Sequence, residues 1–188
     1  WMPKKKKADF MFVQHMISSL KATGRMAVIM PHGVLFRGGE ERKMREWMIK
    51  RGFLEAIIGL PPALFYGTGI PACILIINRA GADTRREILF INADREYKEG
   101  KVQNILRSED IEKMTYVYRN KNPLDKYSSL VSVEELEKEE FNCNIRRYVD
   151  NSPPAEPHDV RAHLHGGIPE AEINALDQYW RNYAGIRE

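Results

Sequence analysis

Residues 24–33 read GRMAVIMPHG, and this stretch indicates the fold class. Five apolar residues in its middle stand between Gly24 and Pro31, residue types that commonly end regular elements. A short apolar run bounded in this way is typical of a strand buried on both faces, as in a parallel sheet. We therefore expect residues 26–30 to form a buried strand of an α/β domain.

Helical patterns flank this strand on both sides. Apolar residues at helical spacing precede it and recur after the following glycine-rich loop, in two sets: Phe10, Val13, Ile17 and Leu20, then Met44, Trp47 and Met48. Further strand candidates follow at residues 53–60, 72–77 and 88–91. This alternation predicts a layered α/β domain. The tight turn at residues 81–84 also predicts an antiparallel pair at one edge of the sheet.

The second half of the chain is more polar. Residues 108–120 predict a helix with Ser108 as its N-cap. The inward side chains of this helix are expected to be Ile111, Met114 and Tyr118. Ser132 is a possible N-cap for a short acidic helix over residues 133–140, and residues 145–149 are expected to be extended.

Prolines and apolar spacing divide the end of the chain. Three prolines within residues 151–157 indicate a linker. Beyond it, an apolar stripe predicts a final helix that docks on another domain or chain: Ile173, Leu176, Trp180 and Tyr183. We therefore predict one domain over residues 1–150, a linker over 151–168 and the start of a C-terminal helical region over 169–188.

The composition is that of an ordinary globular protein, with 43% hydrophobic and 29% charged residues. No stretch approaches the roughly 18 apolar residues of a membrane span, and no signal peptide is visible, so we expect a cytoplasmic protein. The net charge of +3 permits nucleic-acid binding without arguing for it. Cys73 and Cys143 stand far apart, which favours buried thiols in a reducing compartment. Three histidines in the tail match no common zinc spacing, so no metal site is predicted: His158, His163 and His165.

Five segments carry a further pattern when they are taken in order. They read ADFMFVQH at residues 8–15, LKATGRMAVIMPHGVLFRGG at 20–39, LPPALFYGTGI at 60–70, FNCNIRRYV at 141–149 and HGGIP at 165–169. Together they closely resemble the modification subunit of type I restriction enzymes, a family of N6-adenine DNA methyltransferases. The resemblance extends from about residue 8 to about residue 180, and Arg45 on the helix after the second segment also matches it.

The resemblance implies a fold, an activity and partners. The catalytic domain of this family is a Rossmann-like sheet that transfers a methyl group from S-adenosylmethionine to the exocyclic N6 of adenine in DNA. A separate specificity subunit reads the DNA sequence, and a restriction subunit completes the system. We therefore expect the downstream half of such a domain: a partial Rossmann-like methyltransferase sheet with an antiparallel edge, followed by a helical C-terminal tail. The missing half should leave an exposed apolar edge.

Two elements that the resemblance implies lie upstream of the matched region: the cofactor-binding glycine loop and the catalytic Asn-Pro-Pro-Phe or Tyr motif. Of the two proline pairs in this chain, one follows a leucine (residues 60–62) and the other a serine (residues 152–154), so neither is that motif. The Gly-Thr-Gly turn at residues 67–69 leads into a strand candidate, which is the wrong context for a nucleotide loop. We therefore assign no catalytic or cofactor-binding residue and expect S-adenosylmethionine to bind mainly to the upstream part. The chain should be inactive alone.

The resemblance assigns Phe65 to the target base. In related adenine methyltransferases, the phenylalanine after the Leu-Pro loop faces the base that is flipped out of the duplex. Stacking on an aromatic ring returns about 1–3 kcal/mol of the cost of flipping. Two alternatives are that Phe65 packs beneath the loop as core, or that the adjacent Tyr66 takes this role.

Pro31 and Gly33 end the first strand, and the carboxyl ends of strands line the ligand crevice of open α/β sheets. We therefore expect both residues in an active-site loop. Candidates for DNA phosphate contacts come from this loop, the following helix and the N-terminal lysine run: Arg37, Arg45, Lys6 and Lys7. The alternatives are solvated side chains and, for Arg45, an ion pair with a carboxylate.

A second hypothesis comes from a different class of function. In it the chain is a non-catalytic DNA- or subunit-interaction scaffold derived from the same family; an unrelated α/β enzyme is a third. The sequence upstream of Trp1 discriminates between the first two. An intact Asn-Pro-Pro-aromatic motif there favours the enzyme, and a degenerate motif favours the scaffold.

Overall fold

The computed structural model describes residues 8–152 and 164–176. The chain divides into two compact units, residues 1–152 and 153–188, and each is described by itself. The first unit contains a five-stranded sheet in the order β1-β3-β2-β4-β5. Its strands are β1 (Arg25–Pro31), β2 (Leu54–Gly59), β3 (Ala72–Asn78), β4 (Glu87–Asn92) and β5 (Ser128–Ser132). The β2–β4 pair is parallel and the other three pairs are antiparallel, so the sheet is mixed.

The helices of the first unit are α1 (Asp9–Ser19), α2 (Glu40–Lys50), α3 (Ser108–Asn120) and α4 (Val133–Lys138). Short 3-10 turns span His32–Leu35, Ala82–Thr84 and Ile145–Arg147. The second unit contains α6 (Glu170–Ala175). Among the described residues, no helix combines the length and apolar character needed to cross a membrane.

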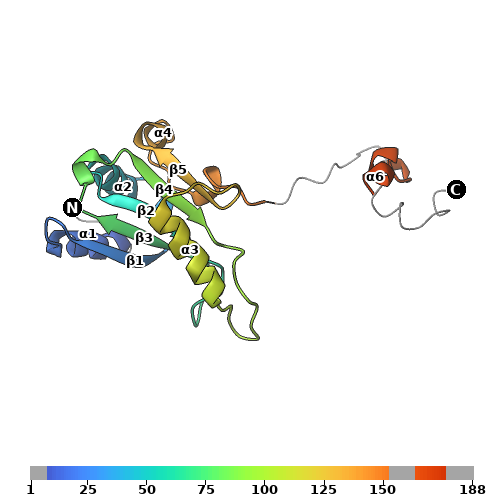
Figure 1. Cartoon of the computed structure of the whole chain (residues 1–188), viewed down its shortest axis with the longest axis horizontal. Helices are drawn as coiled ribbons and strands as arrows, with labels where there is room; N and C mark the ends of the chain where they lie inside the picture. The colour runs from blue at the N-terminus through green and yellow to red at the C-terminus, as the bar shows by residue number, and fades with distance from the viewer. Residues whose placement is uncertain (1–7, 153–163, 177–188) are drawn as a thin grey trace. The chain divides into compact units, whose positions relative to one another are not determined.

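Two apolar clusters cover the two faces of the sheet, because successive strand residues point to opposite sides. On β3, Cys73, Leu75 and Ile77 face the cluster that buries Phe10, Val13 and Ile17 of α1 and Met44 and Met48 of α2. The opposite face packs Ile76 of β3 against Met114 and Val117 of α3. Figure 1 shows α3 crossing one face of the sheet, with α1 and α2 on the other. The predicted α/β layering, the inward face of α1 and the inward positions of Met44 and Met48 are therefore confirmed. Trp47, which was also predicted to face inward on α2, is instead 37% exposed.

The prediction that the first strand is buried on both faces is wrong. On β1, Met26 and Val28 pack against the α1–α2 cluster, but Ile29 on the other face is 52% exposed. β1 is also an edge strand, since β3 is its only strand partner among the described residues. The run is apolar on both faces, yet this part of the chain covers only one of them.

The tight turn between β3 and β4 does not join neighbouring strands, contrary to the sequence prediction. β3 pairs with β1 and β2, whereas β4 lies on the far side of β2 and runs parallel to it. The antiparallel edges of the sheet are instead β1–β3 and β4–β5. Residue spacing predicted the strands themselves, but their order depends on packing that a local turn signal does not contain.

The polar second half differs from prediction in several details. β5 was not predicted, and residues 145–147 form a 3-10 turn instead of an extended segment. Arg107, not Ser108, is the N-cap residue of α3, and its main-chain amide and guanidinium donate to the Asp110 carboxylate. Ile111 is 50% exposed, whereas Met114 is buried as predicted. The cap at Ser132 is confirmed, because its hydroxyl accepts a hydrogen bond from the Glu135 amide.

In the second unit, α6 lies at the start of the apolar stripe that predicts a final helix. Ile173 belongs to α6 and Leu176 is its C-cap, whereas Trp180 and Tyr183 lie outside the described residues. Gly166 and Gly167 before this helix have φ values of 77° and 101°, which side chains disfavour, so the pair forms a glycine-dependent turn beside His165. The other two tail histidines also lie outside the described residues.

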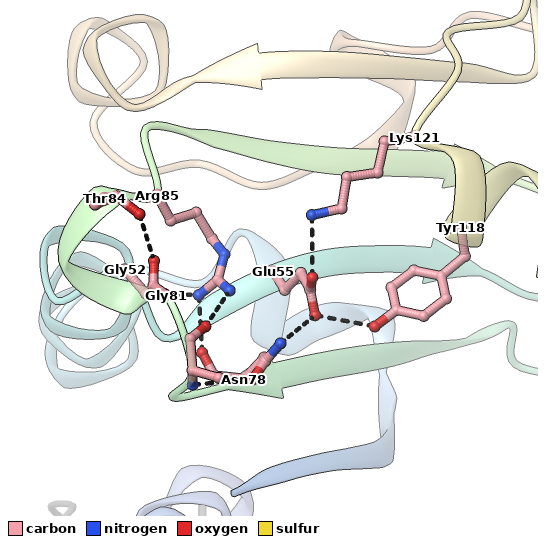
Figure 2. Close-up of polar contacts among 9 residues, drawn as sticks. Gly52, Glu55, Asn78, Gly81, Thr84, Arg85, Tyr118 and Lys121 are labelled. Carbon is pink, nitrogen blue, oxygen red and sulfur yellow. Dashed lines mark hydrogen bonds and ion pairs between the residues drawn. The ribbon is translucent and has the colours of Figure 1, made fainter. Parts of the chain in front are cut away.

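A buried carboxylate joins α3 to the sheet. Glu55 on β2 is 8% exposed, and three donors converge on it (Figure 2). The donors are the Tyr118 hydroxyl at 2.9 Å, the Asn78 amide at 3.1 Å and the Lys121 ammonium at 3.1 Å. Burial alone acts to raise the pKa of Glu55, but these donors outweigh it and lower the pKa below its ordinary value. Beside this network, the Arg85 guanidinium donates to the carbonyls of Gly52, Asn78 and Ala80.

Replacing Glu55 by glutamine should reduce the free energy of unfolding by about 1–2 kcal/mol at pH 7. Because the folded pKa is lowered, this stabilisation is complete above the ordinary glutamate pKa of about 4.3 and is lost as pH falls through the folded value. Denaturant unfolding at several pH values should therefore show the two proteins converging in acid. The same change at Glu112, on the exposed side of α3, is the control. A constant difference at all pH values would contradict the assignment.

Candidate functional site

Three loops follow the carboxyl ends of strands that run in the same direction. β1 and β2 each pair antiparallel with β3, and β2 is parallel to β4, so β1, β2 and β4 end at one edge of the sheet. The segments that follow span residues 32–39, 60–71 and 93–107. Ligands of open α/β sheets bind outside the carboxyl ends of the strands, so this edge is the candidate functional site.

The second of these loops, residues 60–71, presents two neighbouring aromatic side chains. Phe65 is 38% exposed and Tyr66 is 83% exposed. Phe65 forms an isolated β-bridge with Thr68, and Gly67 between them has a φ of 77°. Phe65 is therefore not a core residue, and part of its ring is open to a ligand at this edge.

Pro31 and Gly33 lie at the same edge. Pro31 is the last residue of β1 and pairs with Ala72, and Gly33 follows in a 3-10 turn. Between them, the His32 Nε2 lies 2.9 Å from the Ala72 carbonyl, and burial lowers the pKa of this imidazole. A Cβ on Gly33 would lie 2.4–2.6 Å from the Arg37 guanidinium, so a side chain here would displace the flexible end of Arg37 from its present position.

Arg37, a phosphate candidate from the sequence, lies between two carboxylates. Its Nη1 is 3.4 Å from Asp9 of α1 and 3.4 Å from Glu41 of α2. The side chain is 34% exposed, so solvent still reaches it. A DNA phosphate would compete with both carboxylates for this guanidinium, and the phosphate contact stays a prediction.

Arg45 is not on the surface that a phosphate contact needs. It is 3% exposed, and it donates to the main-chain carbonyls of Val34 and Phe141, each at 2.8 Å. Arg45 thus joins α2 to two distant loops from inside the domain, a structural role that the sequence analysis did not consider. The remaining candidates, Lys6 and Lys7, lie outside the described residues.

Sequence reasoning missed a polar cluster at the same edge. Asp94 follows the end of β4 and accepts hydrogen bonds from Arg146 at 2.9 Å and Asn151 at 2.5 Å. Asn92, the last residue of β4, donates to the Val149 carbonyl at 3.0 Å. These contacts hold residues 145–151 across the strand ends. A polar residue two positions after the end of a buried strand was the available signal for Asp94.

An apolar groove of about 560 Å³ opens on the α3 face of the sheet. Its walls come from β1, β3, α3 and the loop of residues 60–71, and include Ala27, Ile29, Ile74, Ile76, Met114 and Phe65. The groove coincides with the exposed face of β1, whose outer edge no described strand pairs with. The expectation of an exposed apolar edge is therefore confirmed for the described residues.

The described residues offer neither a metal site nor a thiol nucleophile. Within residues 8–152 and 164–176, no three metal-ligating side chains come together. Cys73 and Cys143 are both free and buried, as predicted, and burial raises the pKa of each thiol to about 12. Both thiols are therefore protonated and enclosed at neutral pH.

The apolar groove and the turn of residues 67–69 do not fit S-adenosylmethionine, the methyl donor that the resemblance implies. The groove is apolar, and its amide-bearing residues, Gln103 and Asn104, donate to carbonyls of the neighbouring loop. The turn of residues 67–69 leads into β3 and not into a helix whose amides could hold a ligand. The hydroxyl and amino groups of the donor would find few partners here.

Comparisons with known proteins identify the family of the chain. The family described as N-6 DNA Methylase matches residues 1–156. The chain is 36% identical to the type I restriction enzyme MjaVII methylase subunit of Methanocaldococcus jannaschii, over 98% of this chain and 33% of that protein. It is 35% identical to the MjaVIII methylase subunit of the same organism, over 84% of this chain and 27% of that protein.

A solved structure supports the same relationship. The type I restriction-modification methyltransferase subunit from Streptococcus thermophilus aligns with a TM-score of 0.75 and 39% identity, over 79% of this chain and 31% of that chain. The present chain thus spans about a third of the length of the proteins it matches. Family match and relatives agree, and the chain belongs to the N-6 DNA methylase family, among the methylase subunits of type I restriction-modification systems.

Proposed function

We propose that this chain is the downstream half of a DNA adenine-N6 methyltransferase domain, in the modification subunit of a type I restriction-modification system. The observation that carries this proposal is Phe65, an aromatic side chain 38% exposed at the edge where three strands end. An enzyme that methylates a base of a duplex must first flip the base out, and an aromatic ring can receive it. In this proposal Phe65 stacks on the flipped adenine.

The fold supports separate roles for this chain and for the rest of the full-length subunit. We infer that the sheet is part of a Rossmann-like methyltransferase sheet, and that the rest of the subunit adds a strand at the outer edge of β1 and covers the apolar groove. The exposed Ile29 and the open edge of β1 support this arrangement, because an unpaired apolar strand edge is a template for a further strand and an exposed apolar face favours a covering surface. The upstream part then binds S-adenosylmethionine and supplies the catalytic motif.

The partners follow from the type of system. DNA is the substrate, a specificity subunit selects the site, and a restriction subunit joins the complex. This chain contributes the base platform and a strand edge, and we expect it to be inactive alone. The scaffold hypothesis shares the same fold but predicts no methyl transfer by the full-length subunit.

The proposal is tested by expressing the full-length subunit with its specificity subunit in a bacterial host that lacks adenine methylation. Nucleoside analysis of the host DNA should then reveal N6-methyladenine, and omission of the specificity subunit should abolish it. A complex that binds DNA but leaves adenine unmodified would reject the enzyme and favour the scaffold.

The isolated chain should bind S-adenosylmethionine weakly or not at all. Its groove offers apolar walls and no suitable glycine loop, so the polar groups of the ligand would lose water without gaining partners. Isothermal titration calorimetry of residues 1–188 against the full-length subunit measures the difference. Stoichiometric, tight binding by the short chain would place the cofactor site here and contradict these separate roles.

A further inference from the structure

We infer that Asn104, assisted by Gln103, is a positioning residue that holds the loop of residues 60–71 and thereby sets the location of the Phe65 ring. This inference rests on the proposed function, since it takes Phe65 as the platform for the target base. The residues concerned lie about 40 positions further along the chain, in the segment between β4 and α3.

Three consecutive carbonyls directly before Phe65 accept hydrogen bonds from this segment. The Asn104 side-chain amide donates to Pro62 and the Asn104 main-chain amide donates to Ala63, both at 2.8 Å. The Gln103 side-chain amide donates to Leu64 at 3.3 Å. Asn104 alone thus donates hydrogen bonds to two successive peptide units, which fixes the orientation of the loop as well as its position.

The loop needs this external support because its own backbone provides little at this point. Proline lacks an amide hydrogen, so Pro61 and Pro62 cannot donate. Ala63 has a φ of 52°, a left-handed conformation that is unfavourable for a residue other than glycine. The hydrogen bonds within the loop lie beyond Phe65, from Thr68 to Phe65 and from Ile70 to Thr68. The approach to Phe65 is therefore held in its strained shape by Asn104 and Gln103.

The supporting segment is itself braced at both ends. Lys98 and Ile105 exchange two main-chain hydrogen bonds, at 2.9 and 3.0 Å, which close residues 98–105 into a tight hairpin. A Cβ on Gly100 would lie 2.2 Å from the Gln103 carbonyl, so the hairpin requires glycine there. On the other side, the Asp110 carboxylate accepts hydrogen bonds from the Arg107 amide and guanidinium at the start of α3, which the Tyr118–Glu55 hydrogen bond fixes to the sheet. Because the segment of residues 98–107 is held at both ends, it can fix the position of the loop of residues 60–71.

The consequence for catalysis is a geometric one. Loss of the Asn104 side-chain donor leaves the Phe65 side chain itself unchanged. It removes the hydrogen bond to the Pro62 carbonyl, so the backbone that positions the Phe65 ring is held less firmly. Misplacement of a contact group by about 1 Å can lower a reaction rate by up to about a hundredfold. Loss of this donor should therefore reduce kcat. The KM for DNA should change little, because in the proposed function DNA binding depends on the specificity subunit.

The test uses the full-length subunit with its specificity subunit and genomic DNA from a strain that lacks the system. Asn104→Asp keeps the side-chain volume but removes the donor, and we expect kcat for labelled methyl transfer to fall about tenfold to a hundredfold at nearly constant KM. Asn120→Ala is the matched control, because its amide also donates to a main-chain carbonyl, that of Tyr116 at 2.8 Å, but at the exposed end of α3. Thermal unfolding checks that each variant is folded.

The Phe65→Ala background separates this inference from the proposed function. There, Asn104→Asp should add less than a twofold further loss, because its effect acts through the Phe65 ring. Independent, additive losses would overturn the inference, as would wild-type kcat for Asn104→Asp when Phe65→Ala is impaired. Absence of methyl transfer by the wild-type complex would reject the proposed function itself, and this inference with it.

Discussion

Replacing Arg45 by alanine should reduce the free energy of unfolding of the chain by about 3–5 kcal/mol. This is the largest stability effect that we expect for a charged residue of the chain. The guanidinium is 3% exposed and satisfies the carbonyls of Val34 and Phe141. Alanine removes the guanidinium donor from both carbonyls, next to the 6% exposed Glu41, and leaves the Phe141 carbonyl only the weak thiol donor of Cys143 at 3.7 Å. Burial lowers the pKa of Arg45 from its ordinary value, which reflects how fully the group is removed from water. Urea unfolding of residues 1–188 measures the loss.

Arg42→Ala is the matched control for this prediction. Arg42 lies three positions earlier on α2, and its ion pair with Glu140 is at the surface, with the two side chains 42% and 76% exposed. An exposed pair of this kind contributes about 0–1 kcal/mol. Normal stability of Arg45→Ala, together with weakened DNA binding by the full-length complex, would contradict the structural role and restore the phosphate hypothesis.

Replacing Phe65 by alanine should lower methyl transfer by the full-length complex about 5- to 150-fold while leaving the fold intact. The range corresponds to the loss of about 1–3 kcal/mol of stacking on the flipped base. Little destabilisation is expected because the ring is 38% exposed and lies on a loop. Transfer of labelled methyl groups under saturating S-adenosylmethionine provides the measurement, and circular dichroism provides the check on folding.

The neighbouring Tyr66→Ala variant decides between the two aromatic residues of this loop. Tyr66 is 83% exposed and is not among the residues that line the groove, so its removal should change methyl transfer less than that of Phe65. Unchanged activity of Phe65→Ala with normal DNA binding would remove Phe65 from the base platform. A large loss at Tyr66 alone would transfer the role to that residue.

Local patterns predicted the elements better than their arrangement. The apolar run of residues 26–30 became β1, and the helical spacing of Phe10, Val13 and Ile17 became the buried face of α1. Strand order was not predictable, because the turn of residues 81–84 resembles a hairpin although β4 lies beyond β2. Apolar residues on both faces of β1 likewise could not indicate that one face stays open in this part of the chain.

The candidate site shows a similar division. The placement of Pro31, Gly33 and the Phe65 loop at one edge followed from strand ends and family resemblance. Arg45 was misjudged because its neighbours are charged, although it shares the helical face of Met44 and Met48, at the spacing of a buried stripe. The contacts of Asn104 join segments far apart in the chain, and no local pattern reports such contacts.

The most direct test of the central claim is labelled methyl transfer by the purified full-length subunit with its specificity subunit, followed by identification of the modified nucleoside. We expect label at N6 of adenine, and none when residues 1–188 replace the full-length subunit. Label on cytosine, or no label from a folded complex that binds DNA, would contradict the claim that this chain is half of an adenine-N6 methyltransferase domain.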